Sequence, residues 1–227
     1  RSFYLFGSFK LLMKKIILIT ALSIFGSSFA QQFTIARVQY SGGGDWYGDP
    51  SSLPNLLSFL DEQTPMHPLK EEIRVKLSDS ELSHYPYLYM TGHGNIRLTD
   101  KEIITLRSAL QNGAFLHVDD NYGMDESLRR EMKKVFPHKD FIELPHDHPI
   151  FHTYFKMENG LPKIHEHDGK PPQAFGLFKG EKLLVVYTYE SDLGDGWEDE
   201  SVHHDTWEIR EKALQMGVNI IYFALTQ

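Results

Sequence analysis

Strand and helix patterns alternate along the first part of this chain. Residues 33–40 (FTIARVQY) alternate apolar and polar side chains as a strand does, and leucines at helical spacing follow within residues 50–60. Two further strand patterns occupy residues 73–77 and 85–90. Because parallel strands need long crossover connections, this alternation predicts an α/β protein with a parallel sheet covered by helices on both faces.

The helix predicted after residue 98 has the clearest boundaries. Thr99 and Glu102 form a capping box at its start, three apolar side chains then share one face, and Gly113 supplies the stop. Residues 114–118 follow as a short buried strand, and residues 125–136 have the pattern of another helix. The alternation therefore continues through the middle of the chain.

The pattern changes beyond residue 141, where loops rich in His, Pro and Gly begin. Residues 174–178 and 183–188 flank a turn at Lys179-Gly180-Glu181, which predicts an antiparallel hairpin added to the sheet. Residues 192–199 then combine acidic side chains with two glycines. They lack the order of an EF-hand loop, so we expect a solvated acidic loop there.

A last helix is expected near the end of the sequence. Asp205 and Glu208 can cap its start, and its pattern runs through Met216. Residues 218–225 could continue this helix or form a strand, and we favour the helix. Together, these patterns predict one α/β domain over residues 31–227, with a mostly parallel sheet and an added antiparallel hairpin.

The beginning of the sequence has the pattern of a secretory signal. Lys14 and Lys15 precede an apolar stretch over residues 16–25, and the small residues Ser28 and Ala30 mark a cleavage site. An apolar run of about ten residues is too short to cross roughly 30 Å of hydrocarbon. We therefore predict an exported protein, periplasmic or secreted, that does not insert into a membrane after its signal is cleaved.

We therefore expect three parts in the chain: upstream non-native sequence at residues 1–12, a signal peptide at residues 13–30, and the domain at residues 31–227. Removal of residues 1–30 leaves 19 basic and 31 acidic residues, a net charge of −12. Such a charge argues against nucleic acid or an anionic membrane as the main partner. The sequence has no cysteine, which excludes disulfides, a lipid-modified cysteine and a thiol nucleophile.

Three loops are expected at the carboxyl ends of parallel strands, where ligands bind in open sheets. They span residues 41–50, 91–96 and 119–123, and each places glycine beside polar or aromatic groups. The resulting candidates for ligand binding are Gly43, Gly44, Asp45, Trp46, Tyr47, His93 and Tyr122. The alternative is that these glycines only form turns and that the loop carboxylates cap the following helices.

Candidates for catalysis come from the same loops and from one histidine further along the chain. Asp119-Asp120 stands where a hydrolase nucleophile elbow would lie, although no Gly-x-Ser-x-Gly motif is present. A carboxylate there could act as a base or nucleophile, but a helix cap and buried hydrogen-bond acceptor is favoured. The catalytic candidates are Asp119, Asp120, His93 and His148.

Histidines are concentrated in the second half of the sequence, beside carboxylates such as Asp147, Asp168 and Asp205. Imidazole and carboxylate groups together are the ligands that zinc and related metals use. The spacing is unspecific and no His-Glu-x-x-His motif occurs, so we expect neither a metal nor a cofactor. The histidines concerned are His146, His148, His152, His165, His167, His203 and His204.

Several motifs together resemble the bacterial family called domain of unknown function 4159. They are ARVQY at 36–40, GGGDWY at 42–47, LHVDD at 116–120, HPIF at 148–151, GDGW at 194–197 and MGVN at 216–219. The similarity covers essentially all of residues 33–227. Each motif alone is weak, but the set is specific.

That resemblance implies a three-layer, flavodoxin-like fold of the class I glutamine amidotransferase-like type, related to ThuA-like proteins. Amidotransferases of this fold use a cysteine at the elbow, together with a histidine and a glutamate. This sequence has no cysteine, so glutaminase activity by that mechanism is excluded. The family's own function is uncharacterised, and no catalytic residues can be carried over. The association of ThuA-like proteins with sugar chemistry keeps a carbohydrate-directed enzyme among the alternatives.

Two functions remain open at this point. The favoured one is a non-catalytic ligand-binding or assembly module of the cell envelope, in which Trp46, Tyr47 and Tyr122 stack on a sugar or peptide. The alternative is a hydrolase or lyase for a sugar-like or peptidoglycan-derived substrate, using Asp119 or Asp120 with a histidine. A cleft without any ionisable pair within hydrogen-bond reach would favour the first function. The expected partners are a carbohydrate or peptide ligand and envelope proteins.

Overall fold

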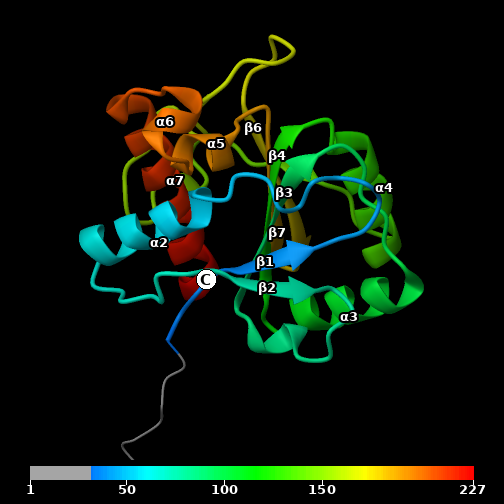
Figure 1. The fold of residues 1–227 in the computed structure, drawn as a ribbon. Coiled ribbons are helices and arrows are strands. Elements are labelled where there is room, and N and C mark those ends of the chain that lie inside the picture. The colour runs from blue at the N-terminus through cyan, green and yellow to red at the C-terminus, as the bar shows by residue number, and fades with distance from the viewer. Residues whose placement is uncertain (1–31) are drawn as a thin grey trace, which may run out of the picture. The chain divides into compact units, whose positions relative to one another are not determined.

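One seven-stranded sheet, in the order β2-β1-β3-β4-β7-β6-β5, organises the described part of the chain (Figure 1). The computed structural model describes residues 32–227, and the predicted upstream sequence and signal peptide lie outside them. The strands are β1 (Ala36–Gln39), β2 (Ile73–Lys76), β3 (Tyr87–His93), β4 (Phe115–Tyr122), β5 (Ile142–Glu143), β6 (Gln173–Lys179) and β7 (Lys182–Tyr189). The α-helices are α2 (Ser52–Gln63), α3 (Asp100–Gln111), α4 (Asp125–Val135), α5 (Leu193–Trp197), α6 (Glu200–His203) and α7 (Trp207–Thr226). Two short 3₁₀ helices, η1 (Leu82–His84) and η2 (Pro149–Phe151), complete the elements.

The sheet is parallel from β2 through β7 and antiparallel beyond it. β1 pairs in parallel with β2 and β3, β4 pairs in parallel with β3 and β7, and β6 runs antiparallel to β7 and β5. If β7 is counted as the fifth parallel strand, the order is 2-1-3-4-5, which is compatible with a flavodoxin-like fold. The predicted mostly parallel α/β sheet with an added hairpin is therefore confirmed.

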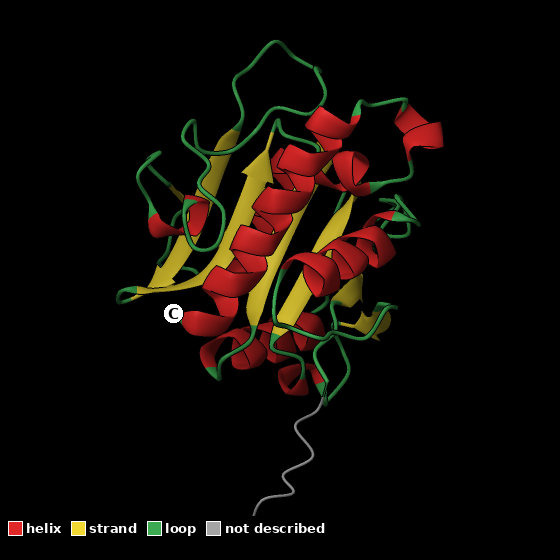
Figure 2. Cartoon of the chain, turned by 90° about the vertical axis from the view of Figure 1, so that its left-hand side faces the viewer, coloured by secondary structure: helices red, strands yellow, loops and turns green. Residues whose placement is uncertain are grey.

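Helices cover both faces of the sheet, and α7 runs along one of them (Figure 2). One apolar core joins the sheet to α3 and α4, and a second joins it to α2, α5 and α7. Because side chains alternate along a strand, neighbours in β4 face different layers. Asp119 reaches α5 through the Gly194 amide, whereas Asp120 bonds to the Met124 amide before α4.

The β1–α2 connection is held by a buried arginine. Arg37, 1% exposed, places its Nε 2.8 Å from Glu72 Oε2, and its Nη1 donates to the Gly48 carbonyl at 2.8 Å. Its Nη2 donates to the Asp49 carbonyl at 3.2 Å. These bonds join the buried guanidinium to the backbone of the loop that precedes α2, where the Asp49 carbonyl also accepts from the Ser52 hydroxyl at 2.7 Å.

Several local predictions can be judged directly. The Thr99–Glu102 capping box is present, and the last helix continues past Gly217 to Thr226 as favoured. The proposed cap is wrong: Thr206 is the N-cap residue, while Asp205 bonds to His165. No helix in residues 32–227 is long and apolar enough to span a membrane.

The prediction of a solvated acidic loop at residues 192–199 is also wrong. The segment contains α5, and it is anchored by Trp197, whose fully buried indole Nε1 donates to the Ala213 carbonyl at 2.8 Å. This anchor draws the acidic residues inward, so that Asp192 is 0% exposed and Glu198 is 4% exposed. A buried aromatic ring thus outweighs the cost of bringing carboxylates close to the core.

Candidate functional site

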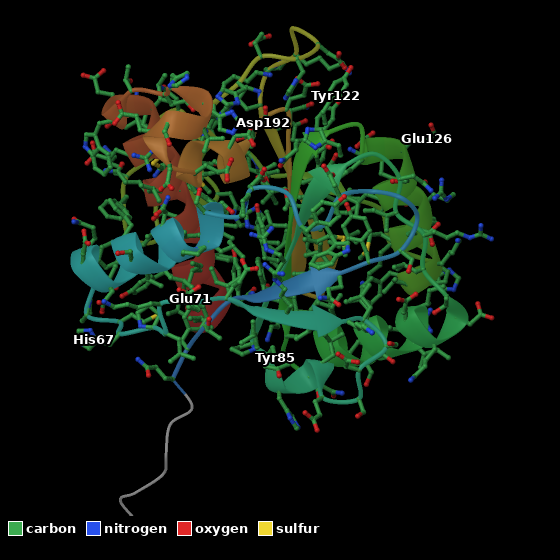
Figure 3. All side chains as sticks on the ribbon, viewed as in Figure 1. His67, Glu71, Tyr85, Tyr122, Glu126 and Asp192 are labelled. Atoms are coloured by element: carbon green, nitrogen blue, oxygen red, sulfur yellow. The ribbon has the colours of Figure 1, made fainter. Side chains whose placement is uncertain are left out.

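The segments predicted as loops at residues 91–96 and 119–123 begin as strand, because β3 continues to His93 and β4 to Tyr122. These strand ends and the loop after β1 meet at the carboxyl edge of the parallel strands. His93 pairs with Tyr122 in the β3–β4 register, and its Nδ1 lies 3.1 Å from Asp45 Oδ2 on the loop after β1. The Gly94 amide donates to the Tyr122 carbonyl at 3.1 Å. Tyr122 and Asp192 lie at the same end of the molecule (Figure 3). Asp45, His93 and Tyr122 are therefore brought to one edge of the sheet.

The glycine-rich loop after β1 forms the outer part of this edge. A Cβ on Gly44 would lie 2.6 Å from the Tyr40 hydroxyl, so the loop packs closely on β1 at that point. Gly43 is exposed, and the half-buried Trp46 packs edge-on against the exposed Tyr47 at 5.5 Å between ring centroids. Gly43 and Gly44 therefore have a structural role: Gly43 has a positive φ, and Gly44 leaves room for the Tyr40 side chain.

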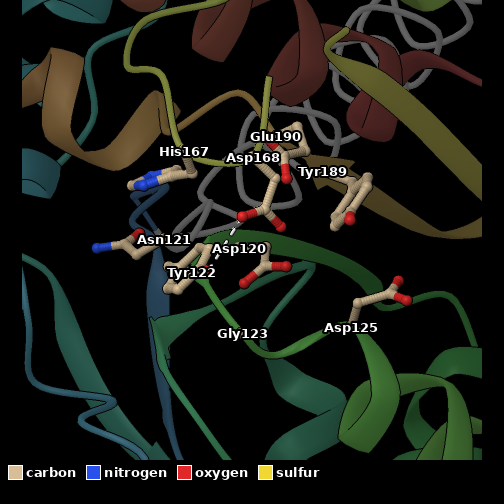
Figure 4. A pocket seen from close by; sticks show the side chains of 9 residues that line it. All are labelled: Asp120, Asn121, Tyr122, Gly123, Asp125, His167, Asp168, Tyr189 and Glu190. Atoms are coloured by element: carbon tan, nitrogen blue, oxygen red, sulfur yellow. Dashed lines mark hydrogen bonds between the residues drawn. The ribbon is translucent and has the colours of Figure 1, made fainter. Parts of the chain in front are cut away.

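A pocket of about 180 Å³ opens beside this edge, between the ends of β4 and β7 (Figure 4). It is lined by Asp120, Asn121, Tyr122, Gly123, Asp125, His167, Asp168, Tyr189 and Glu190. Among these, only Asp120 and Tyr122 were sequence candidates for catalysis or ligand binding. The others come from the end of β4 and the residue after it, from α4, from the loop before β6, and from the end of β7.

The pocket wall is rich in hydrogen-bond acceptors and in rings. The Tyr122 hydroxyl donates to Asp168 Oδ1 at 3.1 Å, and the Tyr122 ring lies 4.8 Å from the His167 ring. Four lining residues carry carboxyl groups, and three of these pair with cations outside the lining. The pairs are Asp125–Arg129 at 2.7 Å, Asp168–Lys170 at 3.4 Å and Glu190–Lys163 at 2.9 Å. The pocket wall therefore contains carboxyl oxygens, and the cations that pair with them do not line the pocket.

Asp120 is the buried hydrogen-bond acceptor that its sequence position suggested, but it is not the helix cap, since Met124 is the N-cap residue of α4 and makes no side-chain capping bond. Its Oδ1 accepts a hydrogen bond from the Met124 amide at 3.0 Å, and its Oδ2 accepts one from the Tyr187 hydroxyl at 2.7 Å. Burial nevertheless raises the pKa of Asp120. The carboxyl group at the pocket wall therefore combines a raised pKa with two oxygens that each accept a hydrogen bond.

Asp119 points to the other face and ends a buried chain of polar groups. It accepts from Thr188 Oγ1 at 2.5 Å and from the Gly194 amide at 2.6 Å. Thr188 Oγ1 also lies 3.0 Å from Nε2 of His117, whose pKa is lowered to about 3 by burial. Burial raises the pKa of Asp119 to about 7, because an ionised carboxylate loses its hydration there.

His167 links the pocket to a buried carboxyl group. Its Nε2 makes a close hydrogen bond to Asp192 Oδ2, and its side chain is 27% exposed while that of Asp192 is 0% exposed. Burial raises the pKa of Asp192 to about 9, helped by the nearby carboxylates Asp119 and Asp195. An ionisable pair within hydrogen-bond reach therefore borders the pocket.

A second cluster lies next to Asp192, formed by the loop before β6, by α5, by α6 and by the start of α7. His165 Nδ1 lies 2.9 Å from Asp195 Oδ2, and its Nε2 lies 3.0 Å from Asp205 Oδ2. His203 Nε2 lies 3.2 Å from Glu198 Oε2. The carboxylates raise the pKa of His165 to about 9. His165, Asp195 and His203 can each offer one ligand atom within 4.8 Å of the others, as a metal site requires.

Strained backbone is concentrated at the same edge. In residues 32–227, four non-glycine residues have positive φ, namely Asp49, Glu190, Asp192 and His204. Glu190 lines the pocket, Asp192 bonds to His167, and Asp49 Oδ2 accepts from Asn121 Nδ2 at 2.7 Å. Left-handed conformations cost on the order of 1 kcal/mol or more outside glycine, and they cluster at functional sites.

His148 is not part of this edge. Its ring lies 5.4 Å from that of Phe223 and 6.4 Å from that of Phe178, beside the β6–β7 turn. That turn is at the opposite end of β7 from Tyr189. The sequence did not indicate that His167 lines the same pocket as Asp120, because this depends on how the loop before β6 crosses the sheet, which periodicity does not encode.

Two comparisons with known proteins bear on identity. A family model described as a domain of unknown function (DUF4159) matches residues 34–225 of the sequence. No curated protein matches it. The family match spans nearly all of the described residues, including every element that contributes to the pocket and to the histidine cluster.

Proposed function

The chain belongs to the DUF4159 family, a domain of unknown function, and we propose from its site that it binds a small, neutral, hydroxyl-rich ligand such as a sugar. The single observation that carries this proposal is the pocket between β4 and β7, whose wall combines carboxyl oxygens with tyrosine and histidine rings. Small-molecule sites of this kind use rings for contact area and a few polar groups for orientation.

The charge of the wall selects among ligand classes. A phosphate or carboxylate would have to approach carboxyl oxygens whose balancing cations, such as Lys163 and Lys170, do not line the pocket. Neutral hydroxyl groups instead donate hydrogen bonds to those oxygens without a like-charge penalty. A neutral polyol is therefore preferred over an anionic sugar.

The size of the pocket sets a further limit. Its volume of about 180 Å³ is below the roughly 300–1,000 Å³ of pockets for drug-sized ligands. A single sugar ring fits this limit better than a long oligosaccharide does. The exposed ring of Tyr122, which is 48% exposed, offers a stacking surface at the mouth.

Two further parts of the proposal concern the cellular location of the protein and the superfamily of its fold. We propose that the protein acts outside the cytoplasm as a module of the cell envelope, which the signal pattern at residues 13–30 supports. We also propose that its fold is of the class I glutamine amidotransferase-like type related to ThuA-like proteins. The strand order 2-1-3-4-5 in the parallel part supports this relationship.

A thermal-shift screen of the purified protein tests the ligand class. Neutral monosaccharides are expected to raise the melting temperature, while sugar phosphates and sugar acids of the same size have little effect. A ligand at 100 times its Kd stabilises by about 2.7 kcal/mol. Tyr122→Ala should abolish the shift, and Tyr47→Ala is the matched control because Tyr47 is exposed but lies outside the pocket. A screen without any neutral-sugar shift, or a shift that survives Tyr122→Ala, would contradict the proposal.

A second candidate function is acid–base catalysis on the bound ligand, as in a hydrolase or lyase. It is favoured by the presence of Asp120, whose pKa is raised, in the same pocket as His167. The histidine differs from the expected His93 and His148. If this function holds, Asp120→Asn should stop turnover of a glycoside of a sugar found in the screen, followed by NMR, yet keep the thermal shift that the free sugar causes. Equal turnover by the parent protein and the variant would contradict a catalytic role for Asp120, and ligand binding would remain as the proposed function.

A further inference from the structure

We propose that His165, Asp195 and His203 bind one divalent transition-metal ion, with Glu198 as a fourth ligand. This metal site is separate from the sugar pocket and does not depend on its ligand. Two imidazoles and carboxylate oxygens form a donor set suited to Zn²⁺ and its neighbours, whereas Mg²⁺ and Ca²⁺ prefer oxygen ligands alone.

The distances between the donor atoms match those of a metal site. Ligand atoms about 2.0–2.2 Å from zinc in a tetrahedron lie roughly 3.4 Å from one another. Here Asp195 Oδ2 is 2.9 Å from His165 Nδ1, and Asp195 Oδ1 is 3.6 Å from His203 Nε2. Glu198 Oε2 lies 3.2 Å from the same His203 nitrogen. Small side-chain adjustments would place all four groups around one ion.

The surroundings of the cluster resemble the outer shell of a metal site. While Nδ1 of His165 faces Asp195, its Nε2 lies 3.0 Å from Asp205 Oδ2. A metal-binding histidine commonly donates its second nitrogen to a carboxylate in this way, which fixes the ring and its tautomer. The Ile164 amide also donates to the Ser191 carbonyl at 2.9 Å, which holds the His165 segment beside α5.

A second, independent observation comes from Asp192. Its side chain is 0% exposed, and its Oδ1 is buried without a hydrogen-bond partner. The other oxygen of the same carboxylate lies 3.9 Å from His165 Nδ1, the nitrogen that faces Asp195. A polar atom buried without a partner is costly, and a nearby cation would offset that cost by favouring the ionised carboxylate.

The cluster is also reachable from solvent. The His165 and His203 side chains are 24% and 29% exposed, and that of Asp195 is 14% exposed. An ion can therefore enter without unfolding the domain. The competing interpretation is a network of protonated histidines and carboxylates that needs no ion, and the two interpretations predict different responses to metal.

Titration of the protein with the metal ion alone distinguishes the metal site from the network without an ion. The protein, freed of metal with a chelator, is titrated with Zn²⁺ by calorimetry and with Co²⁺ by visible absorption. We expect one equivalent of either ion, with Co²⁺ showing the intense ligand-field bands of a low-coordinate site, and no competition from excess Mg²⁺. His203→Ala and Asp195→Asn should weaken binding at least tenfold, and Asp205→Asn should weaken it about 10–100-fold as an outer-shell change.

His138→Ala is the matched control, because His138 is exposed and lies outside the cluster. It should bind Zn²⁺ as the parent protein does. If a cluster variant fails to fold, the Co²⁺ spectrum of the parent protein still decides, since imidazole and carboxylate ligands give a spectrum unlike that of hydrated Co²⁺. The inference is overturned if the parent protein binds no stoichiometric Zn²⁺, or if binding and spectrum persist unchanged in both His203→Ala and Asp195→Asn.

Discussion

Asp119 and Asp120 are adjacent in the sequence but act in different layers of the molecule. Asp119 faces α5 and the Thr188–His117 chain, whereas Asp120 faces the Met124 amide and the pocket. The two-residue period of a strand makes this division predictable. The partners of Asp119 were not predictable, since Thr188 and Gly194 lie about 70 residues further along the sequence.

Asp119 is expected to make stability depend on pH. Its pKa rises from an ordinary 3.8 to about 7 in the folded protein, so the unfolded chain loses this proton first as pH rises. The free energy of unfolding should therefore fall between about pH 4 and pH 7, by at most ~1.4 kcal/mol per pH unit from this group. Among the groups facing Asp119, the carboxylates Asp49 and Asp195 raise its pKa further, whereas the hydrogen bonds from Thr188 and the Gly194 amide lower it. The Tyr89 hydroxyl, 3.4 Å away, is neutral.

Asp119→Asn should flatten this dependence. The amide can keep its oxygen toward the Gly194 amide and donate its nitrogen to Thr188 Oγ1, so the hydrogen bonds are retained. Urea unfolding of parent and variant across this pH range measures the difference, with the exposed Asp147→Asn as the control. A variant whose stability curve runs parallel to that of the parent protein would show that Asp119 is ionised throughout.

At the scale of elements, α5 and α7 pack with unusually close backbones. A Cβ on Gly196 would lie 2.5 Å from the Ala213 Cβ, which is fixed to the α7 backbone and cannot rotate away. Gly196→Ala should therefore destabilise the domain by about 1–3 kcal/mol despite the higher helix propensity of alanine. Adding Ala213→Gly should recover part of this loss in a double-mutant cycle. Additive effects of the two changes would refute the close contact.

The connection between β1 and α2 depends on Arg37 in a comparable way. Arg37→Met removes the closer of the two arginine partners of Glu72, whose side chain is only 9% exposed, and leaves it only Arg74 at 3.3 Å. It also removes the arginine donor of the Gly48 carbonyl. We expect a loss of about 3–5 kcal/mol in the free energy of unfolding. Chemical denaturation of Arg37→Met, Glu72→Met and the double variant tests this. The double variant should cost less than the sum of the single changes, and a fully additive cost would argue against the buried pair.

Elements with strong local signals could be predicted from the sequence. The capping box at Thr99 opens α3 as expected, because both of its partners lie within one turn. α5 could not be predicted in this way: five residues with two glycines have no periodicity, and only the burial of Trp197 against Ala213 makes the segment helical. Tertiary packing therefore determines the conformation of α5, and it also places the acidic residues of this segment beside His165 and His203.

At the scale of the whole molecule, the parallel half of the sheet and its carboxyl edge followed from the alternation of patterns. That half supplies Asp120 and Tyr122 to the pocket. The other wall comes from residues around the antiparallel hairpin, namely His167, Asp168, Tyr189 and Glu190. A sequence pattern can reveal the hairpin, but not where its flanking loop crosses the sheet, so only half of the pocket was predictable.

The central claim is that a neutral sugar binds between β4 and β7, and amide chemical-shift mapping by NMR tests it most directly. Titration with a sugar that raises the melting temperature should shift the amides of Tyr122, His167 and Glu190 in a saturable manner. The amides around His148, at the opposite end of β7, should stay unchanged. Saturable shifts confined to the His148 region, or to the loop around Tyr47, would contradict the proposed site.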